Sequence, residues 1–316
     1  AMPLGMPGLA LAAAVVAVLA AWAYGPGLPA REEELRAAYG QRRVVVCGAS
    51  YGIGAEIAYG LARVNASLLL AARSKDKLQG VARRCRELGA AAVEVHSADL
   101  ATKEGSRSLV EAAEKTLGGV DVLVLNHVIG LYEDWSARIM RGHQDGTLDD
   151  DMGFVDKILS VNTLSYIYLS SYALPALARS AGRLIAVGSV AGKQGMPRTA
   201  PYAASKHAVF GYFDSLRQDL VASPDPALRS ISITAGVLGS FDTESARENT
   251  RGKLDDITWH PPEQAALALL KAGARRWRTV YVPWEQARLF TLFHPLMPSL
   301  LDWVVRWITL SGEHNA

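Results

Sequence analysis

The sequence predicts a single α/β domain built on a doubly wound parallel sheet. Short apolar strand patterns alternate with helical patterns from residue 43 to residue 282. Strands that are apolar along their whole length are typical of a parallel sheet that helices cover on both faces. A glycine-rich turn also separates the first strand pattern from the helix after it, which is the order found at the start of a dinucleotide-binding unit.

The individual elements follow from hydrophobic spacing and from the turn residues between them. We expect strands at residues 44–47, 67–71, 92–97, 122–126, 183–187, 230–234 and 279–282. We expect helices that include residues 75–88, 103–117, 153–174 and 202–220. The polar residues 142–146 and 149–151 are expected to form an exposed loop, and its acidic side chains fit a solvated turn better than a metal site.

The glycine-rich turn predicts a phosphate-binding loop. Its spacing is GxxxGxG, and its candidate cofactor contacts are Gly48, Ser50, Tyr51, Gly52, Ile53 and Gly54. Glycine permits a tight turn and close approach of the backbone to a ligand, and the following helix N-terminus offers free N–H groups to a pyrophosphate. A glycine triplet alone also occurs in loops that merely turn, so the interpretation depends on the strand before it and the motifs after it.

Ser189, Tyr202 and Lys206 form a candidate catalytic set. Tyr202 and Lys206 are four residues apart, which places a phenol and an ammonium side by side on a helix. A nearby cation favours the tyrosinate, so we expect a lowered pKa for Tyr202 and proton exchange near neutral pH. Ser189 follows a strand pattern and therefore lies where open α/β sheets bind ligands.

These motifs, in this order over residues 40–282, resemble the short-chain dehydrogenase/reductase family. The resemblance implies a Rossmann-type fold and a catalytic set of Asn162, Ser189, Tyr202 and Lys206. Tyr202 would be the general acid/base, Ser189 would hold the substrate oxygen, and both would contact the substrate. Lys206 would bind the nicotinamide ribose, and Asn162 would bind a water that links Lys206 to solvent. The alternative for Asn162 is a polar residue that bonds the backbone inside a buried helix.

Within the family, several segments look most like 11β-hydroxysteroid dehydrogenase type 1 and its type 1-like relatives. They include residues 72–75, 126–127, 237–239 and 242–244. By this resemblance the further cofactor contacts are Arg73, Ser74, Asp99, Leu100, Asn126, His127, Val128, Phe241 and Thr243, together with Tyr202 and Lys206. The chain departs from the group in two places: Tyr51 stands where a lysine is expected, and residues 129–153 are longer than expected.

The end of the second strand predicts which nicotinamide cofactor is bound. The chain has Ala72-Arg73-Ser74 there, and no acid precedes Asp76. An acid would bind the ribose 2′-hydroxyl of NAD, whereas an arginine suits a 2′-phosphate. We therefore expect NADP(H). The alternative is that Arg73 is a surface residue at the start of the next helix.

The two ends of the chain are strongly apolar. Residues 1–30 have no charged side chain. A retained single-pass anchor is favoured over a cleaved signal peptide or a disordered tail. The resemblance implies the endoplasmic reticulum membrane with a lumenal domain, while the basic residues after the anchor favour the cytosolic side. Residues 283–316 form an apolar extension, interpreted as a membrane lip or a dimer surface.

The composition and the two apolar ends limit the classes of function that the sequence supports. The net charge of +2 does not indicate nucleic-acid binding, and the two cysteines indicate neither a disulfide nor a metal site. We expect an enzyme that interconverts the hydroxyl and keto groups of a lipophilic substrate, a hydroxysteroid first, with residues 238–254 as the substrate lid. Reduction of retinoid, sphingoid or xenobiotic carbonyls is the alternative, and a non-catalytic nucleotide-binding scaffold is another. By resemblance we expect a homodimer.

Overall fold

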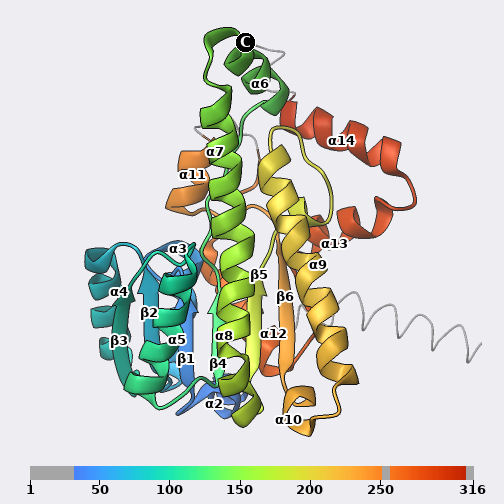
Figure 1. Cartoon of the computed structure of the whole chain (residues 1–316). Coiled ribbons are helices and arrows are strands. Elements are labelled where there is room, and N and C mark those ends of the chain that lie inside the picture. The colour runs from blue at the N-terminus through green and yellow to red at the C-terminus, as the bar shows by residue number, and fades with distance from the viewer. Residues whose placement is uncertain (1–31, 251–256, 311–316) are drawn as a thin grey trace, which may run out of the picture.

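Seven parallel strands form one sheet at the centre of the protein (Figure 1). This computed structural model describes residues 32–250 and 257–310. The strand order is β3-β2-β1-β4-β5-β6-β7. The strands are β1 (Arg43–Cys47), β2 (Ser67–Ala72), β3 (Ala92–Ser97), β4 (Val122–Leu125), β5 (Arg183–Val187), β6 (Ser232–Leu238) and β7 (Thr279–Val282).

The order of the strands creates a crevice where the winding direction reverses. β2 and β4 lie on either side of β1, so the chain runs outward from β1 to β3 and then crosses back to β4. Open α/β sheets bind ligands at the carboxyl ends of the strands beside such a switch point. The predicted doubly wound sheet is therefore confirmed, and it places the candidate site beyond β1 and β4.

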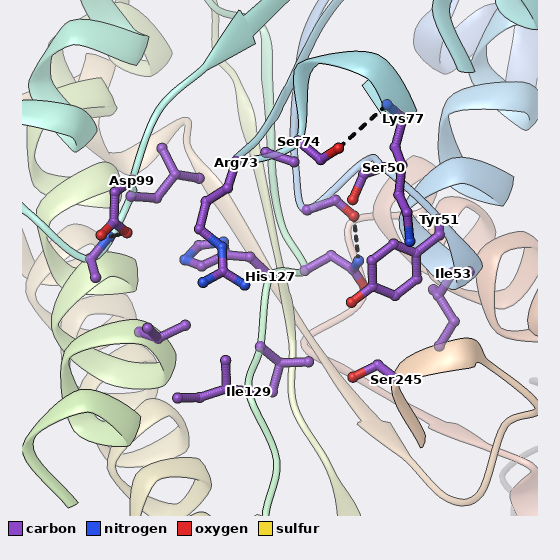
Figure 2. A pocket seen from close by; sticks show the side chains of 18 of the residues that line it. Ser50, Tyr51, Ile53, Arg73, Ser74, Lys77, Asp99, His127, Ile129 and Ser245 are labelled. Atoms are coloured by element: carbon purple, nitrogen blue, oxygen red, sulfur yellow. Dashed lines mark hydrogen bonds between the residues drawn. The ribbon is translucent and has the colours of Figure 1, made fainter. Parts of the chain in front are cut away.

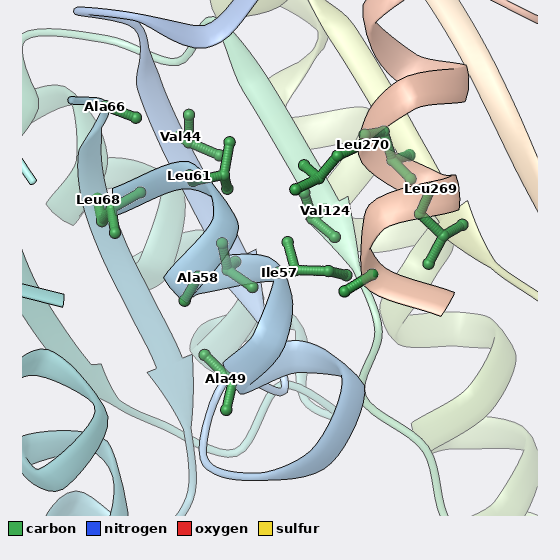
Figure 3. Close-up of a cluster of buried hydrophobic side chains, with 14 of the residues drawn as sticks. Val44, Ala49, Ile57, Ala58, Leu61, Ala66, Leu68, Val124, Leu269 and Leu270 are labelled. Atoms are coloured by element: carbon green, nitrogen blue, oxygen red, sulfur yellow. The ribbon is translucent and has the colours of Figure 1, made fainter. Parts of the chain in front are cut away.

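Helices cover both faces of the sheet, as the sequence predicts. The helices are α2 (Glu32–Tyr39), α3 (Gly52–Arg63), α4 (Lys75–Glu87), α5 (Lys103–Leu117), α6 (Trp135–Asp145), α7 (Leu148–Leu159), α8 (Ser165–Arg179), α9 (Ala200–Ala222), α10 (Pro226–Arg229), α11 (Glu244–Thr250), α12 (Pro262–Ala274), α13 (Trp284–Phe293) and α14 (Pro298–Leu310). Figure 3 shows α3 and α12 packed over the central strands through apolar side chains. α5, α8 and α9 bury the opposite face.

The side chains of each strand alternate between the two faces of the sheet, and both faces are buried, which explains why the strands are apolar throughout. Val44 and Val46 of β1 pack into the cluster under α3 and α12, whereas Val45 and Cys47 pack into the cluster under α8. Successive side chains of a strand point to opposite faces, so a strand buried on both faces shows no polar alternation. All seven expected strands are present, and β6 continues four residues past its expected end to Leu238.

The prediction of a loop at residues 142–151 is wrong, although most of these residues are exposed as expected. This segment belongs to two helices, α6 and α7, which lie beyond the carboxyl ends of the strands (Figure 1). Asp151 is buried and accepts a hydrogen bond from Arg138 Nε at 2.5 Å. Its charge therefore balances a cation on a neighbouring helix, which the local sequence does not distinguish from a solvated acid.

The expected helix at residues 153–174 is interrupted. α7 ends at Leu159, and the π-helical turn η2 (Ser160–Leu164) joins it to α8. Such π-helical turns occur mostly as single bulges inside α-helices, often at functional sites. The turn contains Asn162, one of the candidate catalytic residues.

The expected anchor at residues 1–30 lies outside the described residues. Over residues 32–250 and 257–310, none of the helices has the length and apolar content that a membrane crossing requires. The apolar extension forms α13 and α14 as far as Leu310. Part of the expected substrate lid forms α11, and residues 251–254 of the lid also lie outside the described part of the chain.

Candidate active site

Two adjoining cavities lie beyond the carboxyl ends of the strands. The larger has a volume of about 590 Å³ and is lined by the glycine-rich turn, the ends of β2 and β3, and the segment after β4. The smaller has a volume of about 260 Å³ and contains Ser189, Tyr202 and Lys206 in its wall. Asn126, Val128 and Thr243 line both cavities, so the two spaces meet at this point.

The larger cavity has the features of a phosphate-binding cradle. Gly48 and Gly52 have positive φ angles of 74° and 56°, which favour glycine. A Cβ atom on Gly54 would lie 2.0 Å from the carbonyl oxygen of Gly48, so only glycine fits where α3 approaches the turn. Gly52 and Ile53, the first residues of α3, line the cavity. Their position presents a helix N-terminus to a bound anion.

The opposite wall comes from the ends of β2 and β3. Figure 2 shows the Arg73 side chain directed into the cavity, with Ser74 and Asp99 in the same wall. Ser74 also begins α4, where its Oγ accepts a hydrogen bond from Lys77 N. Leu100 follows Asp99 and completes this wall. The predicted contacts Arg73, Ser74, Asp99 and Leu100 are thus brought together.

The segment after β4 forms the floor of the larger cavity. Asn126 Nδ2 donates a hydrogen bond to Gly48 O at 3.1 Å and so ties this segment to the glycine-rich turn. His127 Nε2 lies 2.6 Å from Ser165 Oγ. Burial, with smaller contributions from the nearby charges of Lys206 and Arg73, lowers the pKa of His127 to about 3. The imidazole is therefore neutral at physiological pH.

Asn162 fixes the backbone beside the cavities. Its Oδ1 accepts from Ile129 N at 2.9 Å, and its Nδ2 donates to Ile129 O at 2.9 Å and to Ser205 Oγ at 3.0 Å. The side chain is completely buried. This arrangement is the backbone-bonding alternative considered from the sequence. The expected water contact remains a prediction.

Ser189, Tyr202 and Lys206 lie together in the wall of the smaller cavity. Ser189 follows β5, and its hydroxyl is hydrogen-bonded to Tyr202. Lys206 is one helical turn after Tyr202 on α9, and its Nζ donates to Val187 O at 3.2 Å. The Nζ atom lies 5.9 Å from the centre of the Tyr202 ring. The predicted spacing is confirmed as a spatial cluster.

The expected lowering of the Tyr202 pKa is wrong for this state of the protein. Burial raises the pKa of Tyr202, and the hydrogen bond with Ser189 lowers it only in part. Burial also lowers the pKa of Lys206 to about 7. The desolvation of both groups outweighs their attraction, because removing a charge from water disfavours its charged form. The sequence could not predict this outcome, since it depends on how deeply both side chains are buried.

The remaining predicted contacts divide between the two cavities. Tyr202, Lys206 and Phe241 line the smaller cavity, and Thr243 lines both. Gly54 is outside the residues that line them and acts through packing. Val128 follows His127 and lines both cavities.

Several lining residues were not among the predicted site residues. Lys77 and Ser245 line the larger cavity, and the smaller one also contains Tyr132, Met196, Asn249, Thr250, Trp259 and Thr309. Of these, Ser245, Asn249 and Thr250 belong to the segment predicted as the substrate lid. Lys77 lies four residues after Arg73, and this spacing could have identified it. It was not identified because the charged run at residues 75–77 is typical of a solvated surface. The others come from α11 and from the ends of segments far apart in the chain. Tyr132 Oη donates to Thr309 O at 3.5 Å, which brings the end of α14 to the smaller cavity.

The fold and the site together define the class of protein. The model of the short chain dehydrogenase family matches residues 42–253, which is more than half of the chain. The chain therefore belongs to this family and is an NAD(P)-dependent oxidoreductase that acts on CH–OH groups. The predicted family is confirmed.

The similarity to curated relatives points to one group within the family. The chain is 41% identical over 264 residues to the hydroxysteroid 11-beta-dehydrogenase 1-like protein of Xenopus tropicalis, covering 84% of this chain and 86% of the relative. It is 36% identical to the protein of the same name from Danio rerio, covering 87% and 88%. The predicted resemblance to the type 1-like group is confirmed at the level of sequence.

Solved structures show the same fold. The RhlG/NADP active-site complex of Pseudomonas aeruginosa superposes with a TM-score of 0.65 at 25% identity, covering 77% of this chain and 95% of that chain. An alcohol dehydrogenase of Thermococcus sibiricus, complexed with 5-hydroxy-NADP, superposes with a TM-score of 0.63 at 22% identity, covering 76% and 94%.

Proposed function

We propose that the protein interconverts a hydroxyl and a keto group on a lipophilic substrate, a hydroxysteroid and its ketosteroid, with NADP(H) as cofactor. The observation that supports this most strongly is the hydrogen-bonded pair of Ser189 and Tyr202 where an apolar cavity meets a dinucleotide-sized one. The names of the curated relatives favour a steroid as the substrate.

Tyr202 is the proton donor and acceptor of the proposed reaction. Burial keeps its phenol protonated, so during reduction it gives that proton to the oxygen of the substrate carbonyl. The bound nicotinamide supplies or receives the hydride at the carbon atom. In the reverse direction Tyr202 takes the proton of the substrate hydroxyl. In the loaded site the single O–H of Ser189 would turn from Tyr202 to the same oxygen and thereby fix its position.

Lys206 and Asn162 support this proton transfer. The pKa of Lys206 is about 7, so its ammonium gains and loses a proton near physiological pH. In the loaded site its Nζ would bind the nicotinamide ribose and return a proton to Tyr202. Asn162 holds the backbone of Ile129 and the hydroxyl of Ser205, and Ser205 immediately precedes Lys206 in α9.

The larger cavity suits NADP(H). Its phosphate cradle fits a dinucleotide, because Gly48 and Gly52 adopt positive φ angles and a helix N-terminus faces the space. The guanidinium of Arg73 points into the part of the cavity after β2, which is where the adenosine ribose is bound in such folds (Figure 2). Arginine pairs favourably with a phosphate in this position.

A lipophilic substrate fits the smaller cavity and the surface near it. Leu131, Met196, Leu238, Phe241 and Trp259 contribute apolar side chains to the wall. Large apolar side chains of α13, α14 and the turn between them are exposed, and they are Leu292, Phe293, Leu296, Met297, Leu300, Trp303, Trp307 and Ile308. Large exposed apolar side chains gathered in one segment of the chain are typical of an interaction surface. We propose that it rests on the endoplasmic reticulum membrane beside the substrate entrance.

The chain is proposed to divide into three parts. Residues 1–30 are proposed to anchor the protein, residues 40–282 to form the catalytic domain, and residues 283–316 to form the apolar extension. A homodimer is proposed from the family resemblance.

The proposal is tested by substrate and cofactor selectivity. Detergent-solubilised full-length protein is assayed for NADPH oxidation with 11-ketosteroids, retinal and simple aryl ketones, and NADH is assayed beside each. We expect turnover of the ketosteroid with NADPH. Turnover of retinal or aryl ketones alone would retain the chemistry and overturn the steroid assignment. Loss of all turnover in both directions would favour a nucleotide-binding scaffold.

A further inference from the structure

The larger cavity contains a cation that neither the glycine-rich turn nor Arg73 supplies. Lys77, in the first turn of α4, lines the cavity beside Ser74. Its Nζ atom lies 5.0 Å from the centre of the Tyr51 ring. Figure 2 shows the Lys77 chain extending from the start of α4 down to Tyr51. A tyrosine in the turn has no positive charge, and Lys77 brings one to the same place.

Lys77 is held there by an acid from the other side of the cavity. Its Nζ donates to both carboxylate oxygens of Glu244 at 3.0 Å. Glu244 is the first residue of α11, and its neighbours Thr243 and Ser245 line the larger cavity. The ion pair therefore joins α4 to α11 at the edge of the cavity.

This ion pair is suited to exchange of partners. The side chains of Lys77 and Glu244 are 48% and 52% exposed. Exposed ion pairs contribute little to stability, so a stronger anion can replace the carboxylate at small cost. A dianionic phosphate is such an anion, because lysine binds it through a charge-assisted hydrogen bond.

We propose that Lys77 is a second cation for the 2′-phosphate of the cofactor, beside Arg73, and that Glu244 holds Lys77 in the empty site. This inference rests on the proposed use of NADP(H). When the cofactor binds, Lys77 Nζ exchanges the carboxylate of Glu244 for the phosphate. Lys77 then also lies between the phosphate and Glu244, and it screens their repulsion.

The test is direct binding of NADP⁺ and NAD⁺ to the full-length protein by isothermal titration calorimetry. Lys77→Met is compared with the wild type and with Lys75→Met, an exposed lysine of the same turn outside the lining residues. We expect Lys77→Met to weaken NADP⁺ binding about tenfold, the usual size of one lost hydrogen bond between charged groups. NAD⁺ binding should not change, and Lys75→Met should leave both affinities unchanged.

Glu244→Gln separates direct contact from an indirect effect. We expect this variant to bind NADP⁺ several-fold more tightly, because Lys77 no longer has a competing partner. If Lys77 touches the phosphate, adding Lys77→Met to Glu244→Gln still costs about tenfold. If Lys77 only neutralises Glu244, Lys77→Met has no effect in that background, and the inference is overturned.

The cofactor proposal and this inference fail in different ways. Equal affinity of the wild type for NADP⁺ and NAD⁺ would contradict both. A wild type that prefers NADP⁺, together with a Lys77→Met variant that keeps the full preference, would contradict only the role of Lys77. A ³¹P NMR titration of bound NADP⁺ gives an independent measurement, because a nearby ammonium lowers the pKa of the 2′-phosphate. That pKa should rise in Lys77→Met.

Discussion

Lys206 is a buried cation whose charge state depends on folding. Its pKa is about 7 in the folded protein, because burial disfavours the ammonium, whereas an unfolded lysine titrates at its ordinary value of 10.5. Between these values the unfolded chain binds the additional proton, so the free energy of unfolding rises with pH over this window. Below pH 7 the folded protein bears the full cost of the buried charge.

Replacing Lys206 by methionine should remove this dependence. We expect Lys206→Met to be more stable than the wild type by a few kcal/mol near pH 6.5, with the gain declining up to about pH 10.5, the pKa of the unfolded lysine. Urea unfolding at several pH values measures the difference. Lys75→Met, a change at an exposed position, serves as the control. Because it retains Lys206, its difference in stability from the wild type should not depend on pH. A gain for Lys206→Met that is the same at every pH would contradict the assigned titration.

Ser189 should influence both the rate of the proposed oxidation and the pH dependence of that rate. Its hydrogen bond lowers the pKa of Tyr202, so Ser189→Ala should raise that pKa further. In the oxidation direction the rate increases as Tyr202 loses its proton, and the midpoint of this increase should move to higher pH. The maximal rate should fall about a hundredfold, the lower range for a group that assists proton transfer. An unchanged midpoint in the pH–rate profile would be inconsistent with the bond.

The sequence identifies the residues of the site better than their electrostatics. The spacing of Tyr202 and Lys206 and the position of Ser189 after a strand predict that these side chains meet, and they do. The direction of the Tyr202 pKa shift could not be predicted, because it depends on burial by distant segments. Lys77 was missed because a charged run at the start of a helix usually faces solvent.

At the scale of elements, the approach of α3 to the glycine-rich turn depends on Gly54. Gly54→Ala would place a Cβ 2.0 Å from Gly48 O, and we expect it to lower the free energy of unfolding by about 3 kcal/mol or more and to weaken cofactor binding.

Gly80→Ala on α4 is the matched control. In the described part of the chain, nothing lies within 4 Å of the added Cβ apart from its chain neighbours and the backbone of its own helix. This variant should be stabilised by about 0.5–1 kcal/mol, because alanine favours a helix interior. Urea unfolding compares the two variants, and equal stabilities would contradict the close approach.

Asn162 joins the π-helical turn to the segment after β4 and to α9. Asn162→Ala would leave the N–H and C=O of Ile129 without their partner, and Ser205 Oγ would lose a donor. A buried group that loses its partner costs about 1–3 kcal/mol, and the groups of Ile129 are half-buried, so the free energy of unfolding should fall by about 1 kcal/mol or more. Ser205→Ala removes only one of these three bonds and should cost less. An effect of Asn162→Ala no larger than that of Ser205→Ala would show that the Ile129 contacts contribute little.

Elements were predictable where the local pattern determines them. The seven strands follow from their apolar runs and from the turns that bound them. The break between α7 and α8 was not predictable, because a π-helical turn leaves the helical spacing of the sequence almost unchanged. The helical structure of residues 135–152 was missed, because the sequence does not show that Asp151 is buried and paired with Arg138 rather than solvated.

At the scale of the whole molecule, the proposed membrane contact rests on the exposed apolar surface of α13 and α14. Trp303 and Trp307 are 57% and 63% exposed. Tryptophan prefers the interface between lipid headgroups and water. The end of α14 also reaches the smaller cavity at Thr309, so a membrane contact there would lie next to the proposed substrate entrance.

Quenching of tryptophan fluorescence by brominated lipids tests this contact. We expect full-length protein in such bilayers to be quenched, and Trp303→Phe with Trp307→Phe to remove a substantial part of the quenching. Trp277→Phe changes a tryptophan that packs against the core and should leave the quenched fraction unchanged. Quenching that is the same with and without Trp303 and Trp307 would contradict the membrane contact and favour a protein surface instead.

The central claim is that Tyr202 transfers the proton while hydride moves in the adjoining cavity. The most direct measurement compares ketosteroid turnover and NADP⁺ affinity of the wild type, Tyr202→Phe, and the control Tyr172→Phe on α8. We predict that Tyr202→Phe lowers kcat about a thousandfold with NADP⁺ affinity nearly unchanged, since general acid catalysis has this size. Tyr172→Phe should behave as the wild type. A Tyr202→Phe variant that turns over at the wild-type rate would contradict the account.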